Sequence, residues 1–136
     1  MIHNSSSGQS LIEVVVVAGL IMLILVALVA GATVAIRNSQ FSRTKARAMQ
    51  LNLEAMEWIR GERKEGWSEF ASRNGTFCLK ELNFDAPGNC SSSDQFIRQA
   101  VLTKEGTDKI EVKLNTSWTD SNGEHNEEII TYLTKW

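Results

Sequence analysis

Few residues of this 136-residue chain combine the type and spacing that catalysis or binding requires. The clearest candidate is the acid Glu13, which directly precedes the 23 uncharged residues 14–36. A charged side chain costs about 2.5–3.5 kcal/mol at the centre of a membrane helix and less near its end, so such acids are usually paired or functional. We therefore expect Glu13 to be paired or functional; the alternative is an acid placed at a helix N-terminus because the helix dipole favours it.

The other candidates lie near the C-terminus. Asp120, Asn122 and Glu124 alternate like the start of a calcium loop, but the remaining EF-hand ligands are missing, so we interpret them as turn residues. His125 follows them, and we expect a solvated histidine in the same turn. The sequence contains no phosphate-binding glycine loop, nucleophile elbow or zinc-protease motif. We expect no enzymatic activity, no cofactor and no metal site.

The chain contains two cysteines, Cys78 and Cys90, on either side of a segment with Pro87. An even cysteine count in a small domain favours a disulfide, which would stabilise this loop by ~3 kcal/mol and indicates a location outside the cytoplasm. A metal site is disfavoured, because His3 and His125 are the only histidines and no CxxC motif exists.

The uncharged segment 14–36 has the length of a membrane span. As a helix it would extend roughly 35 Å, against a hydrocarbon core of about 30 Å. It is apolar on every face, and so short a remainder of chain could hardly enclose it as a buried core helix. A cleaved signal peptide is the alternative, with a small-residue site at 30–32 and a mature chain beginning at Thr33. Against it, the run is longer than a typical signal core of about 7–15 residues, and no Lys or Arg precedes it.

Charge is distributed unevenly along the chain. Residues 37–73 carry eight Lys/Arg and five Asp/Glu, whereas residues 74–136 carry six and ten. The acidic C-terminal part disfavours nucleic acid as a partner. Four basic residues follow the apolar segment: Arg37, Arg43, Lys45 and Arg47. By the positive-inside rule they would place the C-terminal part in the cytoplasm. This orientation conflicts with the expected disulfide.

The stretch Gly8-Gln9-Ser10-Leu11-Ile12-Glu13, followed at once by an apolar helix, resembles the processing site of type IV prepilins and type II secretion pseudopilins. The resemblance implies that a prepilin peptidase cuts after Gly8 and methylates the new amine of Gln9. It also implies that Glu13 meets the N-terminal amine of a neighbouring subunit, where the two ions neutralise each other and set the stagger of the helices.

Three features depart from that family's pattern. The leader, residues 1–8, lacks basic residues, and Gln9 stands where a phenylalanine is usual. The helix also lacks the proline that bends many pilin helices, although Gly19 and Gly31 could loosen it at about 1 kcal/mol each relative to Ala. The match covers residues 1–60, and the last hairpin resembles that of some minor pilins more loosely.

Beyond residue 36 the apolar pattern becomes amphipathic and predicts that one helix continues from about Leu11 to Arg60. Gly61, Gly66 and Gly75 then interrupt it, with a helical turn expected over 67–73. The expected apolar face comprises Phe41, Ala48, Ala55 and Ile59, and the opposite polar face comprises Arg43, Arg47, Glu54 and Glu57.

The remainder alternates with a period of two and predicts an antiparallel sheet. Strands are expected at 110–118 and 127–135, joined by a tight turn at Asn122-Gly123, with a third at 95–102 and a weaker fourth at 76–82. We expect an α+β fold in which this sheet packs on the amphipathic helix. The tryptophans are expected to serve in packing or anchoring: Trp58, Trp67, Trp118 and Trp136.

These expectations divide the chain into a leader (1–8), a membrane and assembly helix (9–36), a helical stem and connector (37–73) and an extracytoplasmic head (74–136). The resemblance implies a minor pilin or pseudopilin, held in the cytoplasmic membrane as a single-pass protein and then assembled into an extracytoplasmic filament. Its partners would be other pilin subunits, the prepilin peptidase and the assembly platform. The alternative is a permanent single-span membrane protein whose head senses or binds a ligand; an enzyme acting on pilins or peptidoglycan is a distant third.

Overall fold

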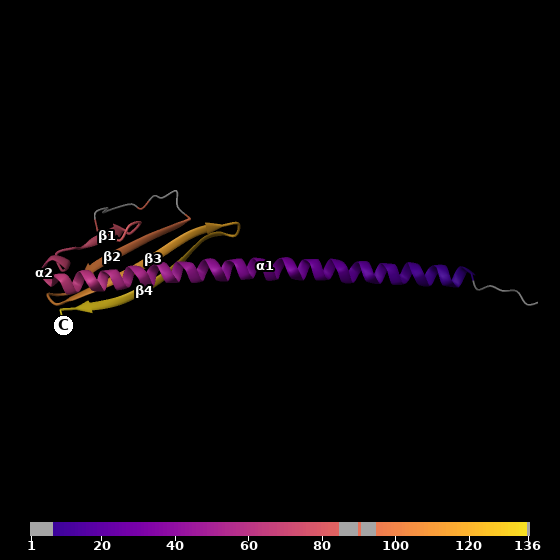
Figure 1. The fold of residues 1–136 in the computed structure, drawn as a ribbon, viewed down its shortest axis with the longest axis horizontal. Helices are drawn as coiled ribbons and strands as arrows, with labels where there is room; N and C mark the ends of the chain where they lie inside the picture. The colour runs from indigo at the N-terminus through magenta and orange to yellow at the C-terminus, as the bar shows by residue number, and fades with distance from the viewer. Residues whose placement is uncertain (1–6, 85–89, 91–94, 136) are drawn as a thin grey trace, which may run out of the picture. The chain divides into compact units, whose positions relative to one another are not determined.

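The computed structural model describes residues 7–84, 90 and 95–135, with side chains from residue 11 onward. The chain divides into two compact units, Met1–Ser42 and Arg43–Trp136. Helix α1 (Ser7–Glu65) belongs to both, and the short helix α2 (Trp67–Phe70) follows it. Figure 1 shows these helices and the four strands of the second unit.

The first unit contributes only helix to the described structure. From Leu11 onward its side chains are exposed on every face of the helix. This part of α1 is long and apolar enough to cross a membrane.

Helix α1 is longer than the expected span from Leu11 to Arg60. Gly61 was expected to interrupt the helix, but it lies inside α1. A glycine within a helix costs only about 1 kcal/mol relative to Ala, and the buried side chains of Met56 and Ile59 hold this turn against the sheet. The helix ends where Gly66 takes an extended conformation, with φ −169°.

The second unit is an antiparallel meander with the strand order β1-β2-β3-β4. The strands are β1 (Gly75–Cys78), β2 (Phe96–Lys104), β3 (Lys109–Asp120) and β4 (Gly123–Thr134). The C-terminal part of α1 packs on one face of this sheet (Figure 1). The expected α+β fold is confirmed. Strand β1 is shorter than expected because the chain turns away from β2 after Leu79.

The core lies between α1 and the inward face of the sheet. Ala48, Ala55 and Ile59 are fully buried, as the amphipathic pattern predicted, whereas Phe41 is exposed. Strand β3 alternates strictly between buried and half-buried residues up to Trp118. The main cluster comprises Ala55, Met56, Ile59, Phe70, Ala71, Phe77, Leu79, Ala100, Leu102, Ile110, Val112, Leu114 and Leu133.

The β3–β4 turn differs from the prediction by one residue. Asp120 pairs with Gly123, so the two loop residues are Ser121 and Asn122, and not Asn122 and Gly123. Gly123 has φ +122°, a conformation that residues with a Cβ rarely adopt. His125, expected in the turn, therefore lies in β4 opposite Trp118.

Candidate functional site

The expected processing segment forms the beginning of α1. Gly8 and Gln9 have helical backbone in the first turns of this helix. Glu13 lies one turn further on and is exposed. Residues 1–6 of the expected leader lie outside the described part of the chain.

Glu13 has no cationic partner among the described residues. The next basic residue along the chain is Arg37. At 1.5 Å per residue, a separation of 24 residue steps corresponds to about 36 Å along the same helix. Of the residues before Glu13, none is Lys or Arg. A cation that pairs with Glu13 must therefore be the chain's own N-terminal region or another molecule.

Cys78 and Cys90 form the expected disulfide, with Cα atoms 5.4 Å apart. The bond fixes the end of β1 to the segment that leads toward β2. Pro87 and Gly88, within this loop, lie outside the described residues.

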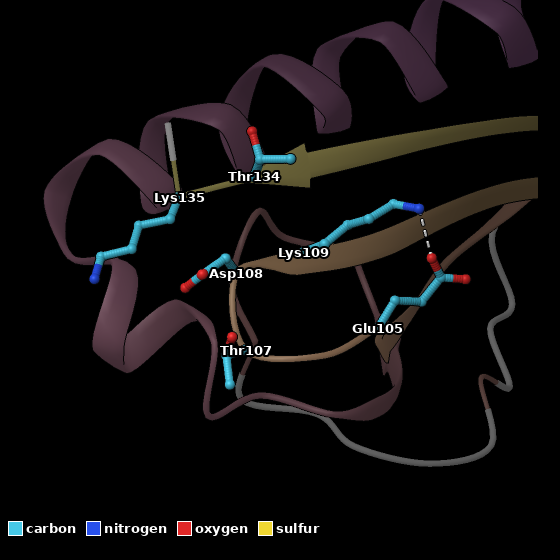
Figure 2. Close-up of a pocket in the computed structure, with 6 residues that line it drawn as sticks. All are labelled: Glu105, Thr107, Asp108, Lys109, Thr134 and Lys135. Carbon is cyan, nitrogen blue, oxygen red and sulfur yellow. Dashed lines mark ion pairs between the residues drawn. The ribbon is translucent and has the colours of Figure 1, made fainter.

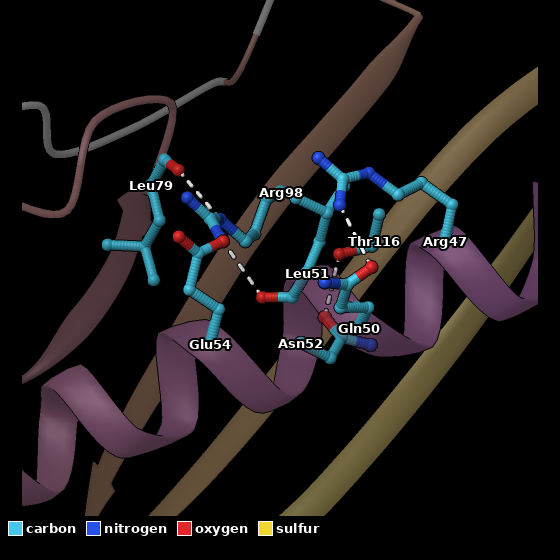
Figure 3. Close-up of polar contacts among 8 residues, drawn as sticks. All are labelled: Arg47, Gln50, Leu51, Asn52, Glu54, Leu79, Arg98 and Thr116. Carbon is cyan, nitrogen blue, oxygen red and sulfur yellow. Dashed lines mark hydrogen bonds and ion pairs between the residues drawn. The ribbon is translucent and has the colours of Figure 1, made fainter.

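Arg98 is a buried cation between the helix and the sheet, with 9% of its surface exposed. Its Nε donates to Leu79 O at 2.8 Å, and its Nη1 donates to Leu51 O at 3.0 Å. The same Nη1 lies 3.2 Å from a carboxylate oxygen of Glu54, which is half exposed. Figure 3 shows these contacts joining α1, β2 and the segment after β1. Arg98 thus joins α1, β2 and the segment after β1 through its hydrogen bonds.

A second polar group is buried where α1 crosses β3 and β4. Thr116 Oγ1 donates to Asn52 Oδ1 at 2.7 Å, and Asn52 Nδ2 donates to the backbone oxygen of Glu127 at 2.9 Å (Figure 3 shows the first of these bonds). Lys45 forms an ion pair with the Glu127 carboxylate at 2.9 Å. Every group in this network is paired, so it fixes how the helix lies along the sheet.

The β3–β4 hairpin, whose acids alternate like the start of a calcium loop, is closed by its own side chains. Asp120 Oδ1 accepts the Asn122 N–H at 2.7 Å and lies 3.0 Å from His125 Nε2. The bond from the Asn122 N–H, followed by the contact with His125, lowers the pKa of Asp120 below its ordinary value. The His125 ring stacks on Trp118, with centroids 5.5 Å apart. Asp120 therefore serves turn closure.

A shallow surface depression lies at the opposite end of the sheet (Figure 2). Within it, Lys109 Nζ contacts a Glu105 carboxylate oxygen at 2.7 Å, which raises the pKa of Lys109. The depression is open to solvent and offers no nucleophile beside a base. Its lining residues are Glu105, Thr107, Asp108, Lys109, Thr134 and Lys135. In the described ranges, no cluster of His, Cys, Asp or Glu is arranged to hold a metal ion.

The tryptophans within the described part of the chain take part in packing. Trp118 is 3% exposed, and Trp58 and Trp67 pack against the edge of the core. Trp136 lies outside the described residues. Arg98 and Asn52 were missed by the sequence analysis, although Asn52 occupies an inward position between Ala48 and Ala55 on the amphipathic helix.

Comparisons of the chain with protein-family models, curated proteins and solved structures found no match.

Proposed function

We propose that this protein is a prepilin-like subunit that is cut after Gly8 and assembled through its N-terminal helix into a filament of the pilus or pseudopilus type. The observation that carries the proposal is the placement of Glu13. It is an acid at the border of a long apolar helix, and no Lys or Arg of its own chain lies within reach.

Burying an ion is costly unless an ion of opposite charge is buried beside it. An isolated carboxylate loses several kcal/mol of hydration when helices pack around it, and a cation in contact restores much of that loss. A cut after Gly8 would create a positive amine at Gln9, one helical turn before Glu13. In a staggered bundle, the amine of one copy pairs with Glu13 of another, which favours a single stagger over its alternatives.

The second unit supports an extracytoplasmic role for the head. Its disulfide favours an oxidising compartment. The basic residues that follow the span argue for the reverse orientation by the positive-inside rule. The proposal follows the disulfide, which the structure forms, over the orientation that these basic residues favour.

The processing step is tested by mass spectrometry of the N-terminus of protein recovered from membranes of cells that contain a prepilin peptidase. The expected result is a chain that begins at Gln9 with a methylated amine. Gly8→Ala should abolish the cut, and Ser7→Ala is the matched control that should leave it unchanged. An intact Met1 start in these cells would contradict the proposal and leave a permanent single-span protein; a start at Thr33 would indicate a cleaved export signal.

The assembly step is tested with Glu13→Gln, which keeps the size of the side chain and removes its charge. We expect normal processing, a normal amount of protein in the membrane and loss of the protein from sheared surface filaments. Val14→Ala, at the neighbouring position, is the control that should still assemble. If Glu13→Gln assembled as well as the wild type, the ion-pair role of Glu13 would be wrong.

A further inference from the structure

A row of three side chains is exposed along the flank of α1 beside β4. Lys45, Met49 and Leu53 are four residues apart, so they follow one another along one side of the helix at intervals of about 6 Å. The Nζ of Lys45 contacts the Glu127 carboxylate at 2.9 Å, which places this row on the β4 side. Met49 is 45% and Leu53 54% exposed. These three residues are called the α1 row below.

A second row lies on the outer face of β4, the face that points away from α1. Glu128, Ile130 and Tyr132 are its exposed members, and they alternate with more buried residues that face the helix. Along a strand, every second residue recurs at intervals of about 6–7 Å. Ile130 is 49% and Tyr132 50% exposed. These three residues are called the β4 row.

The two rows have nearly the same spacing and the same order of chemistry. Each begins with a charged side chain and continues with two large apolar ones, and the charge is basic in the α1 row and acidic in the β4 row. Residues 43–65 of α1 and strand β4 also run in the same sense (Figure 1). Copies that cross one membrane in the same orientation therefore present both rows in the same direction.

We propose that the α1 row of one copy packs on the β4 row of a neighbouring copy of this chain, with the two copies parallel. The facing pairs are Lys45 with Glu128, Met49 with Ile130, and Leu53 with Tyr132. The interface is heterologous, because each copy contributes a different surface, so it can be repeated from copy to copy as a filament requires. The contact rests on the proposed assembly of parallel copies, but not on the cut after Gly8.

The order of the side chains fixes both the direction and the register of this contact. If the copies were antiparallel, Leu53 would face Glu128 and Lys45 would face Tyr132. If they were parallel but shifted by one step, Met49 would face Glu128. Each of these arrangements sets a charge against an apolar side chain, which costs free energy when water is excluded. The parallel arrangement in the proposed register avoids this cost.

The charged residues at the start of the rows can pair between copies without losing the partners in their own chain. The ammonium group of Lys45 has three donors, and Glu127 accepts from one of them. One carboxylate oxygen of Glu128 lies 2.8 Å from Lys113 Nζ, and the carboxylate has a second oxygen. An added pair between Lys45 and Glu128 therefore extends the existing ion pairs.

Tyr132 is already held in one position on the outer face. Its hydroxyl donates to a Glu111 carboxylate oxygen at 2.9 Å, and Lys109 Nζ lies 3.9 Å from the centroid of its ring. A side chain that is ordered before binding loses little entropy when it is covered. Tyr132 is thus a suitable anchor for Leu53 of the neighbouring copy.

The contact requires the two copies to be offset along the helix axis. Within one chain, Glu127 contacts both Lys45 and Asn52, so it lies level with the part of α1 around Met49. Ile130 lies three residues, about 10 Å, further along β4. Ile130 of one copy therefore reaches the level of Met49 in the next when the copies are shifted by about 10 Å. A two-fold axis parallel to the helices cannot supply such a shift, whereas a staggered filament does.

The test is disulfide cross-linking of the full chain in detergent micelles that hold two or more copies. Two chains with different tags, one with Met49→Cys and one with Ile130→Cys, are purified together from cells that lack a prepilin peptidase. Cys78 and Cys90 are already joined to each other. We expect a cross-linked heterodimer under mild oxidation and only background from either variant alone, because the proposed contact joins two different surfaces.

Asn126→Cys in place of Ile130→Cys is the matched control for the register. Asn126 is exposed on the same face of β4 but lies four residues, about 13 Å, from Ile130. A disulfide requires Cα atoms within about 7 Å, so this pair should give only background. Equal yields from Ile130→Cys and Asn126→Cys would overturn the proposal.

A second variant tests whether the α1 row itself makes the contact. Leu53→Glu, added to the Met49→Cys chain, sets a charge against Tyr132 and should lower the heterodimer yield at least about tenfold. Gln50→Glu is its matched control, since it adds the same charge at an exposed helix position outside the row and should leave the yield unchanged. A yield insensitive to Leu53→Glu would contradict the proposal.

The outcome is separate from that of the processing experiment. The cross-linked chains are uncut, so a failure of the proposed cut after Gly8 would leave the expected heterodimer unchanged. Conversely, a chain that is cut and assembled as proposed, but gives no heterodimer from Met49→Cys with Ile130→Cys, would overturn this contact alone.

Discussion

Thr116 on β3 and Asn52 on α1 are joined by a hydrogen bond of 2.7 Å, and both residues are fully buried. The bond connects positions 64 residues apart in the sequence. Because Asn52 also donates to the Glu127 backbone, a single side chain of the helix is tied to two neighbouring strands. This buried amide fixes the position of the helix along the sheet, which apolar contacts alone define less sharply.

Asn52→Leu should lower the free energy of unfolding by about 1–3 kcal/mol, because it leaves the buried Thr116 hydroxyl without its acceptor. The measurement is urea unfolding of the full chain in detergent micelles, followed by tryptophan fluorescence. Adding Thr116→Val should recover part of the loss, since the stranded hydroxyl is then removed. If adding Thr116→Val to Asn52→Leu lowered the free energy of unfolding as much as Thr116→Val does alone, the two side chains would not be coupled.

Arg98→Met should destabilise the second unit by about 1–3 kcal/mol, because the backbone oxygens of Leu79 and Leu51 lose a charged donor. Arg98→Lys should not restore stability, since an ammonium group cannot reproduce the forked geometry of the guanidinium. The control is Glu54→Gln, which should cost less than about 1 kcal/mol because this carboxylate is half exposed. Thermal unfolding of the three variants side by side would check this order, and a larger loss for Glu54→Gln than for Arg98→Met would contradict it.

The order of the elements could be predicted because each has a clear apolar period. The inward residues of β3 alternate from Ile110 to Trp118, and the helix buries Ala48, Ala55 and Ile59 as its pattern required. The end of the helix could not be predicted from Gly61, since packing offsets the modest cost of one glycine. The turn was misplaced by one residue, because the Asp120 carboxylate caps the Asn122 N–H.

The polar contacts of the core were beyond the reach of sequence patterns. Arg98 binds Leu51 and Glu54, more than 40 residues away, and no local spacing reveals such a pairing. The candidate assembly site is the opposite case. The spacing from Gly8 to Glu13 is local and could be recognised, but its proposed partner belongs to another molecule, so its role stays a prediction.

Removal of the disulfide through Cys78→Ser with Cys90→Ser should lower the free energy of unfolding by about 2–4 kcal/mol, because the loop between them regains its freedom in the unfolded chain. The loss should appear first at β1. The Leu79 N–H donates to Arg98 O at 2.9 Å, and its hydrogen exchange should accelerate in the double variant. The control is the wild type with its disulfide reduced, which should show the same faster exchange at Leu79. If the exchange at Leu79 were unchanged in both the double variant and the reduced wild type, the disulfide would not hold this segment.

Asp120 should make the hairpin sensitive to acid. The pKa of Asp120 is lowered in the folded chain, first by the hydrogen bond from the Asn122 N–H and second by His125. The contribution of Asp120 to folding stability is therefore complete above its ordinary pKa of 3.8. It is lost as the pH falls through the lower pKa of the folded chain. Asp120→Asn keeps an oxygen that accepts the Asn122 N–H but removes the charge. We expect it to unfold at lower urea concentration than the wild type at about pH 7, with a difference that shrinks toward about pH 3 and below.

Asp108→Asn is the matched control for this acid sensitivity. Asp108 lies in the turn before β3 and binds Lys135 through its backbone oxygen, a bond that the substitution leaves intact. It should therefore shift the unfolding midpoint less than Asp120→Asn at neutral pH. A deficit of Asp120→Asn that stayed the same at both pH values would show that the side-chain geometry of Asp120, and not its charge, closes the hairpin.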